Sequence, residues 1–239
     1  DRYTIYSPND VVIENAGEGT DVVYSNLFDY TLTANVENLN LDDDAHTGRG
    51  NDLGNRIYGN EETNLLFGGD GDDTLYGMNG DDTLDGGGGS DFIWADMYNG
   101  ANGNDTYLFG RGSGTDFVED QDSTVGNLDT ILLGSDLQEA DIIVKMVHTL
   151  SDPCAHLEVS IVGTDDTLTV YNWINDWSGY DSGEYQVEQI QFANGTVWDS
   201  AMIQEKVRKP SVGDDYILGA NVAEILHGAD GDDEIIGYG

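Results

Sequence analysis

Apolar positions recur every nine residues through the first half of this chain. From Gly50 the sequence divides into successive nonapeptides in which the sixth residue is Asp or Asn and the eighth is a bulky aliphatic residue. The eighth positions are Ile57, Leu66, Leu75, Leu84 and Ile93, and the sixth positions are Asn55, Asn64, Asp73, Asp82 and Asp91. A short, fixed period of this kind is the sequence signature of a repeat architecture.

The residue types predict how each nonapeptide folds. The first half is rich in glycine, which adopts positive φ and permits close backbone approach, so it forms a tight turn. The last three residues form a short strand whose middle, apolar side chain points inward. One unit cannot bury that side chain alone, but stacked units can. Two units make one coil, which stacks Asn55, Asp73 and Asp91 on one side and Asn64 and Asp82 on the other.

Weaker copies of the pattern occur elsewhere in the chain. After an interruption at residues 95–99, Asp105 and Asp116 resume the sixth position. Near the C-terminus, Asp215, Glu224 and Asp233 lie nine residues apart, and Asp21 belongs to a degenerate N-terminal version.

Residues 119–207 follow a different pattern. Runs of β-branched and aromatic residues separated by turn signals predict conventional strands, and residues 200–207 after Asp199 predict one short capped helix. The fold class that we expect is all-β, a parallel β-roll solenoid interrupted by a β-rich domain with one short helix. The expected domains are a degenerate start of the roll at 1–49, the regular roll at 50–118, the β-rich domain at 119–209 and a second roll segment at 210–239.

The charge of the chain narrows its possible partners. It has 47 acidic and 8 basic side chains, for a formal net charge of −39. Phosphate recognition needs a basic surface, so nucleic acid is excluded, and anionic membrane surfaces are excluded by the same repulsion. No apolar run of about 18 residues is present, so we expect no membrane insertion. The single cysteine, Cys154, excludes a disulfide framework and a thiolate zinc cluster.

Stacked carboxylates repel one another strongly in the interior of a turn unless a cation lies between them. Carboxylates and glycine carbonyls are the oxygen ligands of a hard cation, whereas zinc prefers His or Cys. The sequence therefore predicts several bound calcium ions as cofactors.

The units GGDGDDTLY and GMNGDDTLD, at residues 68–85, resemble the RTX, or haemolysin-type calcium-binding, nonapeptide GGxGxDxUx. Residues 119–207 resemble the β-rich domain that often follows such repeats in large secreted bacterial proteins. The resemblance implies a parallel β-roll with ions between turns two units apart, for example between the turns of Asp73 and Asp91 and between those of Asp82 and Asp105. The residues that it implies as calcium ligands are Gly69, Gly71, Asp73, Gly77, Asn79, Gly80, Asp82, Gly86, Gly88, Asp91, Asn102, Gly103, Asp105, Asp116, Asp21, Asp215 and Asp233.

Two functions fit these observations. The first is a structural calcium-binding module of a secreted bacterial protein, such as an adhesin, matrix, surface-layer or filament component, that folds in extracellular calcium. The second is the C-terminal secretion and folding domain of a secreted protease, lipase or epimerase. The motifs HExxH, GxSxG and GxxxxGK[ST] do not occur in this chain, so we expect no catalytic activity. In the resembling family the calcium-free chain passes a one-step (type I) secretion channel unfolded.

The ends of the chain and its aromatic residues bear on further partners. Both ends are in repeat phase without a polar cap, which predicts continuation into a longer repeat chain or end-to-end self-association. Seven aromatic residues could form a glycan-binding platform, although aromatic residues spaced along strands more often belong to a core. They are Tyr171, Trp173, Trp177, Tyr180, Tyr185, Phe192 and Trp198.

Overall fold

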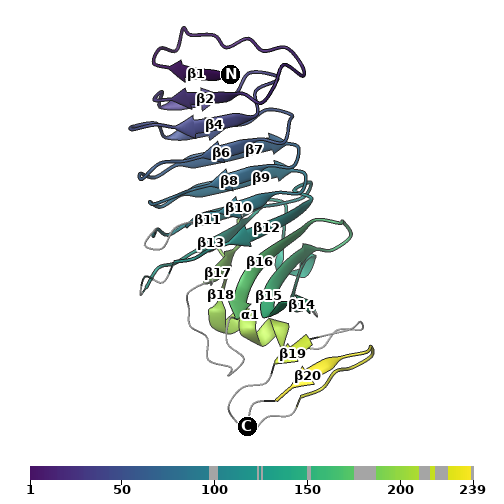
Figure 1. Cartoon of the computed structure of the whole chain (residues 1–239). Helices are drawn as coiled ribbons and strands as arrows, with labels where there is room; N and C mark the ends of the chain where they lie inside the picture. The colour runs from purple at the N-terminus through teal and green to yellow at the C-terminus, as the bar shows by residue number, and fades with distance from the viewer. Residues whose placement is uncertain are drawn as a thin grey trace.

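The computed structural model describes residues 1–96, 102–122, 124, 126–149, 152–174, 187–209, 216–218 and 226–237. Two facing β-sheets run along most of its length (Figure 1). Sheet 1 has the order β1 (Arg2–Ile5), β2 (Val22–Ser25), β4 (Asn38–Leu41), β6 (Arg56–Tyr58), β8 (Thr74–Tyr76), β10 (Phe92–Trp94), β12 (Thr115–Glu119), β16 (Thr167–Ile174), β15 (Asp152–Ile161) and β14 (Ile142–Thr149). Sheet 2 has the order β18 (Val197–Asp199), β17 (Gln189–Gln191), β13 (Thr130–Leu133), β11 (Thr106–Phe109), β9 (Thr83–Gly88), β7 (Leu65–Asp70), β5 (Thr47–Arg49) and β3 (Asp29–Thr31).

From β4 to β13 the chain alternates between the two sheets, and each strand pairs in parallel with the strand two further along. In sheet 1, Leu75 lies in register with Ile57 on one side and Ile93 on the other, and all three are buried between the sheets. Leu66 and Leu84 form the equivalent column in sheet 2. The predicted all-β parallel roll, with its eighth positions inside, is confirmed.

Glycine is required where neighbouring coils approach most closely. Gly87 has φ of 95°, and a Cβ atom on it would lie 2.0 Å from the carbonyl oxygen of Gly69 in the preceding coil. A side chain there would separate the coils, because no real Cβ contact is that short.

Both sheets continue beyond residue 118, into the segment that the sequence separates as a β-rich domain. β16 pairs in parallel with β12, and β17 pairs in parallel with β13. Antiparallel strands then follow, with β15 and β14 beyond β16 and with β18 beyond β17. A short 3₁₀ helix, η1 (Glu139–Asp141), precedes β14.

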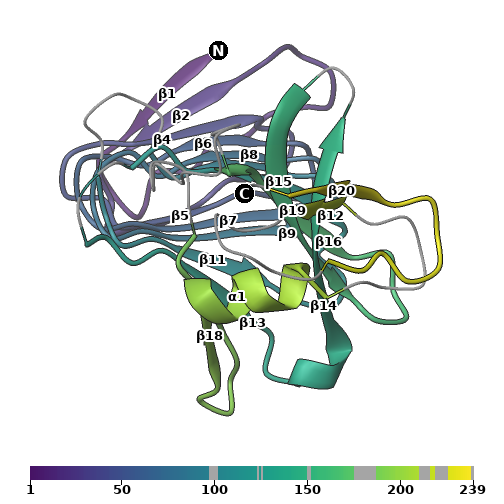
Figure 2. The same ribbon diagram turned by 90° about the horizontal axis from the view of Figure 1, so that it is seen from below.

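The helix α1 (Ser200–Val207) lies beside the last strands at the end of the roll, as Figures 1 and 2 show. Asp199 caps it, since its side chain accepts a hydrogen bond of 2.9 Å from the Met202 amide, and Ile203 and Val207 are buried. The predicted short helix is confirmed. No helix in the described part of the chain is long and apolar enough to cross a bilayer.

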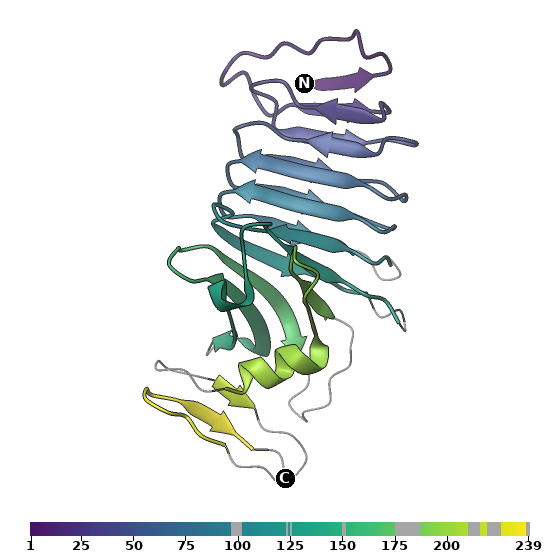
Figure 3. The ribbon, with the colours of Figure 1, turned by 180° about the vertical axis from the view of Figure 1, so that it is seen from behind.

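A two-stranded sheet, in the segment predicted as a second roll segment, follows α1 and lies beyond it in Figure 3. β19 (Tyr216–Leu218) and β20 (Glu234–Ile236) pair in parallel, with Ile217 opposite Ile235. Of the predicted ligands here, Asp233 is described, whereas Asp215 lies outside the described residues.

Aromatic rings on the outer face of sheet 1 stack on one another across the strands. The centroids of Tyr58 and Tyr76 are 4.4 Å apart, and those of Tyr76 and Trp94 are 5.0 Å apart. A second row is formed by Phe92, Phe117 and Tyr171. Such cross-strand pairs stabilise the register of the sheet.

The aromatic residues considered as a glycan platform are distributed differently. Trp173, Phe192 and Trp198 are buried in the core, and the face of Tyr171 stacks on Phe117. Trp177, Tyr180 and Tyr185 lie outside the described residues.

Candidate metal centres

The sixth-position side chains form a ladder along one side of the roll. One carboxylate oxygen of Asp73 accepts a hydrogen bond from the Asn55 amide (2.6 Å), and Asp91 accepts one from the Asp73 amide (2.8 Å). Asp116 continues the ladder by accepting from the Asp91 amide at 3.2 Å. Each side chain therefore links its own coil to the preceding one.

A second ladder runs along the opposite side. Asp82 accepts from the Asn64 amide (2.7 Å), and Asp105 accepts from the Asp82 amide (2.8 Å) across the interruption in the repeat. Asp129 accepts from the Asp105 amide at 2.7 Å, and Glu188 accepts from the Asp129 amide at 2.7 Å. The structure thus extends this ladder by two acids that the nine-residue spacing does not reveal.

The other carboxylate oxygen of four of these aspartates has no protein donor. Oδ2 of four ladder residues is buried without a hydrogen-bond partner in the described structure, namely Asp73, Asp82, Asp91 and Asp105. None of the four forms an ion pair with a Lys, Arg or His side chain among the described residues. A buried anionic oxygen without a donor or counter-ion is strongly unfavourable.

Burial has a clear electrostatic consequence for these groups. It raises the pKa of Asp73 to about 7 and that of Asp82 to about 8. Burial likewise raises the pKa of Asp105 to about 9 and that of Asp116 to about 8. The anionic form of each therefore requires a positive charge that the surrounding side chains do not supply.

Glycine at the first position of each unit leaves the space beside these oxygens open. A Cβ atom on Gly68 would lie 2.2 Å from Asp73 Oδ2 and 2.3 Å from the Gly86 carbonyl oxygen. On Gly77 it would lie 2.4 Å from Asp82 Oδ2. Carboxylate and carbonyl oxygens thus converge where only glycine fits, and an all-oxygen donor set of this kind suits calcium.

The coils that carry asparagine are built differently. Oδ1 of Asn55 accepts a hydrogen bond from the Asn51 amide at 2.7 Å, and that of Asn64 accepts one from the Asn60 amide at 2.7 Å. The Asn55 side-chain amide donates to the carbonyls of Val36 and Glu37, at 3.1 and 3.2 Å. These coils therefore satisfy their buried polar atoms with neutral amides, without a cation.

Some of the glycines predicted as ligands lie against backbone of a neighbouring coil, and others lie beside a ladder carboxylate. Cβ atoms on Gly69, Gly71 and Gly80 would meet the backbone of the preceding coil, at Asn51, Leu53 and Glu62 respectively. A Cβ atom on Gly86 would lie 2.2 Å from Asp91 Oδ2, and one on Gly103 would lie 3.0 Å from Asp105 Oδ1. A Cβ atom on Gly88 would instead lie 3.2 Å from the Gly112 carbonyl oxygen. The first-position Gly68 is absent from the predicted ligands, although its nine-residue recurrence is visible in the sequence.

The remaining predicted ligands lie at the margins of the ladders. Asn79 Oδ1 accepts from the Asn102 amide (3.1 Å), and the Asn102 carbonyl accepts from the Gly80 amide (3.0 Å). In the second roll segment, a Cβ atom on Gly228 would lie 2.0 Å from Asp233 Oδ2, which repeats the arrangement of Gly68 and Asp73.

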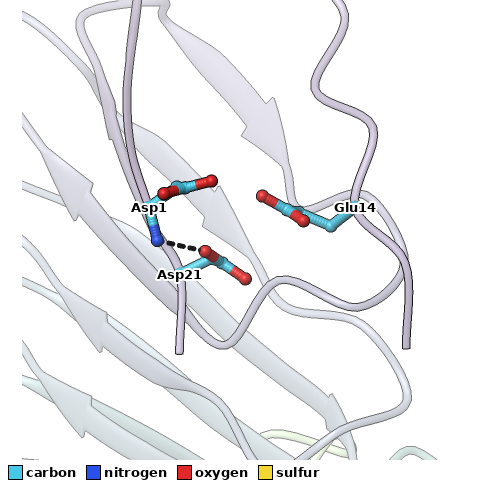
Figure 4. A group of neighbouring side chains, drawn as sticks. All are labelled: Asp1, Glu14 and Asp21. Atoms are coloured by element: carbon cyan, nitrogen blue, oxygen red, sulfur yellow. Dashed lines mark hydrogen bonds and ion pairs between the residues drawn. The ribbon is translucent and has the colours of Figure 1, made fainter. Parts of the chain in front are cut away.

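Asp21 lies at the start of the first ladder, where its amide donates to Glu37 at 2.7 Å. Its side chain forms an ion pair with the amino group of Asp1, close to Glu14 (Figure 4). One carboxylate oxygen from each of Asp1, Glu14 and Asp21 lies within 4.8 Å of the other two.

The comparisons with known proteins agree with this geometry. Residues 58–93 and 218–239 match the RTX calcium-binding nonapeptide repeat family, and residues 156–202 match the haemolysin-type calcium binding protein related domain. The chain therefore contains RTX nonapeptide repeats, which bind several calcium ions. RTX repeat proteins are typically secreted.

One relative is the iron-regulated protein FrpA of Neisseria meningitidis serogroup C. It is 34% identical over 128 residues, which cover 53% of this chain and 11% of FrpA. The similarity thus concerns a small part of a much longer protein.

The ladders predict which substitutions are coupled. Asp73→Ala and Asp91→Ala should be non-additive in their effect on calcium-dependent stability, because the Asp73 amide donates directly to Asp91. Asp82→Ala lies on the opposite ladder and should be additive with Asp73→Ala within about 0.5 kcal/mol. Urea unfolding of single and double variants in millimolar calcium measures both cycles. Strong coupling of Asp73 with Asp82, but not with Asp91, would contradict the ladder assignment.

Proposed function

We propose that this chain is a non-catalytic, structural calcium-binding module of a large secreted bacterial protein, such as an adhesin, matrix, surface-layer or filament component. Its place of action in this proposal is outside the cell or on the cell surface. The observation that carries the proposal is the row of buried, donor-free carboxylate oxygens on both sides of the roll.

The charge distribution gives these oxygens a role in folding. Residues 57–110 contain eleven acidic side chains and no Lys or Arg, so their mutual repulsion opposes the stacking of coils at neutral pH. Calcium lowers this repulsion, and because the ladders exist only in the stacked coils, its binding free energy becomes folding free energy. Extracellular calcium modules bind at about 10⁻⁴ to 10⁻³ M. The roll would consequently be unfolded at cytosolic calcium and folded outside.

A calcium titration of the whole chain tests the proposal. Far-UV circular dichroism should show β structure rising with calcium, with most of the change at about 10⁻⁴ to 10⁻³ M. Magnesium is the control, because it requires near-ideal octahedral geometry and retains its waters, so equal concentrations should leave the chain largely unfolded. Full β content in the presence of a chelator would contradict the proposal. Light scattering in the same titration shows whether calcium also drives end-to-end association.

A further inference from the structure

Four buried carboxylates lie in the last coils of the roll, between the segments that match the family models. They are Asp96, Asp105, Asp120 and Asp129, here called the terminal acidic cluster. None of the four is more than 1% exposed.

The strand register explains why these residues meet. Asp105 and Asp129 immediately precede β11 and β13, whose first residues Thr106 and Thr130 lie opposite each other. Asp120 immediately follows β12 and reaches the same side of the roll. One carboxylate oxygen from each of Asp105, Asp120 and Asp129 lies within 4.8 Å of the other two.

Two of these side chains present oxygens that the protein leaves unsatisfied. Both oxygens of Asp96 and Oδ2 of Asp105 are buried without a hydrogen-bond partner among the described residues. The charges of Asp120 and Asp122 act on Asp96, which adds to the effect of burial in raising its pKa to about 8. These unpartnered oxygens are an observation independent of the clustering, and they point to a cationic ligand.

The donors that reach the cluster are neutral. The Tyr107 hydroxyl donates to Asp120 Oδ2 at 2.8 Å, and the Asn127 side-chain amide donates to Asp129 Oδ2 at 2.8 Å. These hydrogen bonds orient two carboxylates but compensate none of their charge. The arrangement therefore resembles a set of ligands held in place by outer contacts.

The composition of the cluster differs from that of the repeat sites. Tyr76, Trp94 and Glu119 lie in register, so the residues that follow them, Gly77, Ala95 and Asp120, occupy equivalent positions. Asp120 thus replaces the first-position glycine with a carboxylate. By the same register, Asp96 lies at the position equivalent to Met78, one residue after Ala95 and Gly77. A calcium site gains affinity with the number of charged ligands and with rigidity.

A surface pocket adjoins the cluster. Gly103, Asp122 and Asn127 are among the residues that line it, and the Gly103 amide donates to Asp122 Oδ2 at 3.4 Å. Asp122 and Asn127 are each two residues from a cluster carboxylate in the chain, namely Asp120 and Asp129, so the pocket lies beside the segment that carries these two carboxylates.

We propose that the terminal acidic cluster is a calcium site of higher affinity than the repeat sites, with carboxylates in place of most of the turn carbonyls. It ties β10 and β11 to β12 and β13, so its occupation fixes the end of the roll on which β16 and β17 are built. The proposal rests on the calcium-dependent folding proposed above and adds that this site fills first.

Calcium titration of the full chain in competition with a chromophoric chelator tests the site. The wild type should take up about one calcium roughly tenfold or more tightly than the rest, as the span between sensor and extracellular sites allows. Asp96→Asn and Asp120→Asn should each lose the tight step and keep the weaker ones. Asp73→Asn is the matched control, since it is also a buried ladder residue with an unpartnered oxygen. It should keep the tight step and lose weak uptake.

Unchanged tight binding in both cluster variants, or no tight step in the wild type, would overturn the proposal. If protons shared between the carboxylates, rather than a cation, compensated the charge of the cluster, Asp96→Asn and Asp120→Asn would be more stable than the wild type in chelator. Both variants would then bind calcium as the wild type does, and this result would also overturn the proposal. Failure of the proposed function is distinct, because the wild type and Asp73→Asn would then also show no calcium-dependent folding.

Terbium luminescence gives a second measurement if the cluster variants do not fold. Tyr107 donates to a cluster carboxylate, so excitation of tyrosine should sensitise the first equivalent of terbium bound to the wild type. Tyr107→Phe should reduce that emission at least severalfold. Undiminished emission in Tyr107→Phe would place the first ion elsewhere and overturn the proposal.

Discussion

On removal of calcium, amide-exchange protection should disappear from the coils that carry the aspartate ladders, from β8 to β12, before it disappears from the coils of β4 to β6. Their Oδ2 atoms, in Asp73, Asp82, Asp91 and Asp105, have no protein donor, so without a cation each stacked coil buries uncompensated charge. The coils around Asn55 and Asn64 satisfy the equivalent atoms with amides. In a solenoid, stability is approximately a sum over coils and their interfaces, so β4 to β6 should retain protection to lower calcium.

Hydrogen exchange followed by mass spectrometry, at calcium concentrations from chelator to millimolar, measures this order. Magnesium at the same concentrations is the control for ionic strength and charge. Simultaneous loss of protection in both groups of coils would show that asparagine does not replace the ion. Undiminished protection of β8 to β12 in chelator would show that calcium is not needed there.

Gly68→Ala should disable the site at Asp73 and destabilise the roll in calcium by about 3 kcal/mol, the upper range for overpacking a well-packed interior. The new Cβ atom would lie 2.2 Å from Asp73 Oδ2 and 2.3 Å from the Gly86 carbonyl oxygen. Gly68 does not have the positive φ that would strain alanine, so the loss would come from displacing these two oxygens.

Gly110→Ala is the matched control. Its Cβ atom would meet nothing closer than 3.8 Å, and Gly110 also lacks a positive φ. Its stability should change by less than about 0.5 kcal/mol. Urea unfolding and calcium stoichiometry in millimolar calcium compare the two variants. A Gly68→Ala protein that binds and unfolds as the wild type does would show that these oxygens are not part of a calcium site.

The sequence by itself determined the repeat, the fold class and the chemistry of the ligands. A nine-residue period with one aliphatic residue per unit has one efficient packing, in which Leu66, Leu75 and Leu84 point into a common interior. The helix after Asp199 was equally readable, because capping depends on residues a few positions apart. Calcium followed from the combination of acids and glycine, since these are local properties of each turn.

The tertiary structure decided which residues share a site. Asp129 and Glu188 join the second ladder although 59 residues separate them, because β13 and β17 pair in parallel. Asp96 and Asp120 have no place in the nonapeptide motif and come together only through the register of β10 and β12. Hydrophobic periodicity is set by neighbours along the chain, whereas a ligand set is assembled from different coils, and the lengths of the loops between them decide which carboxylates meet.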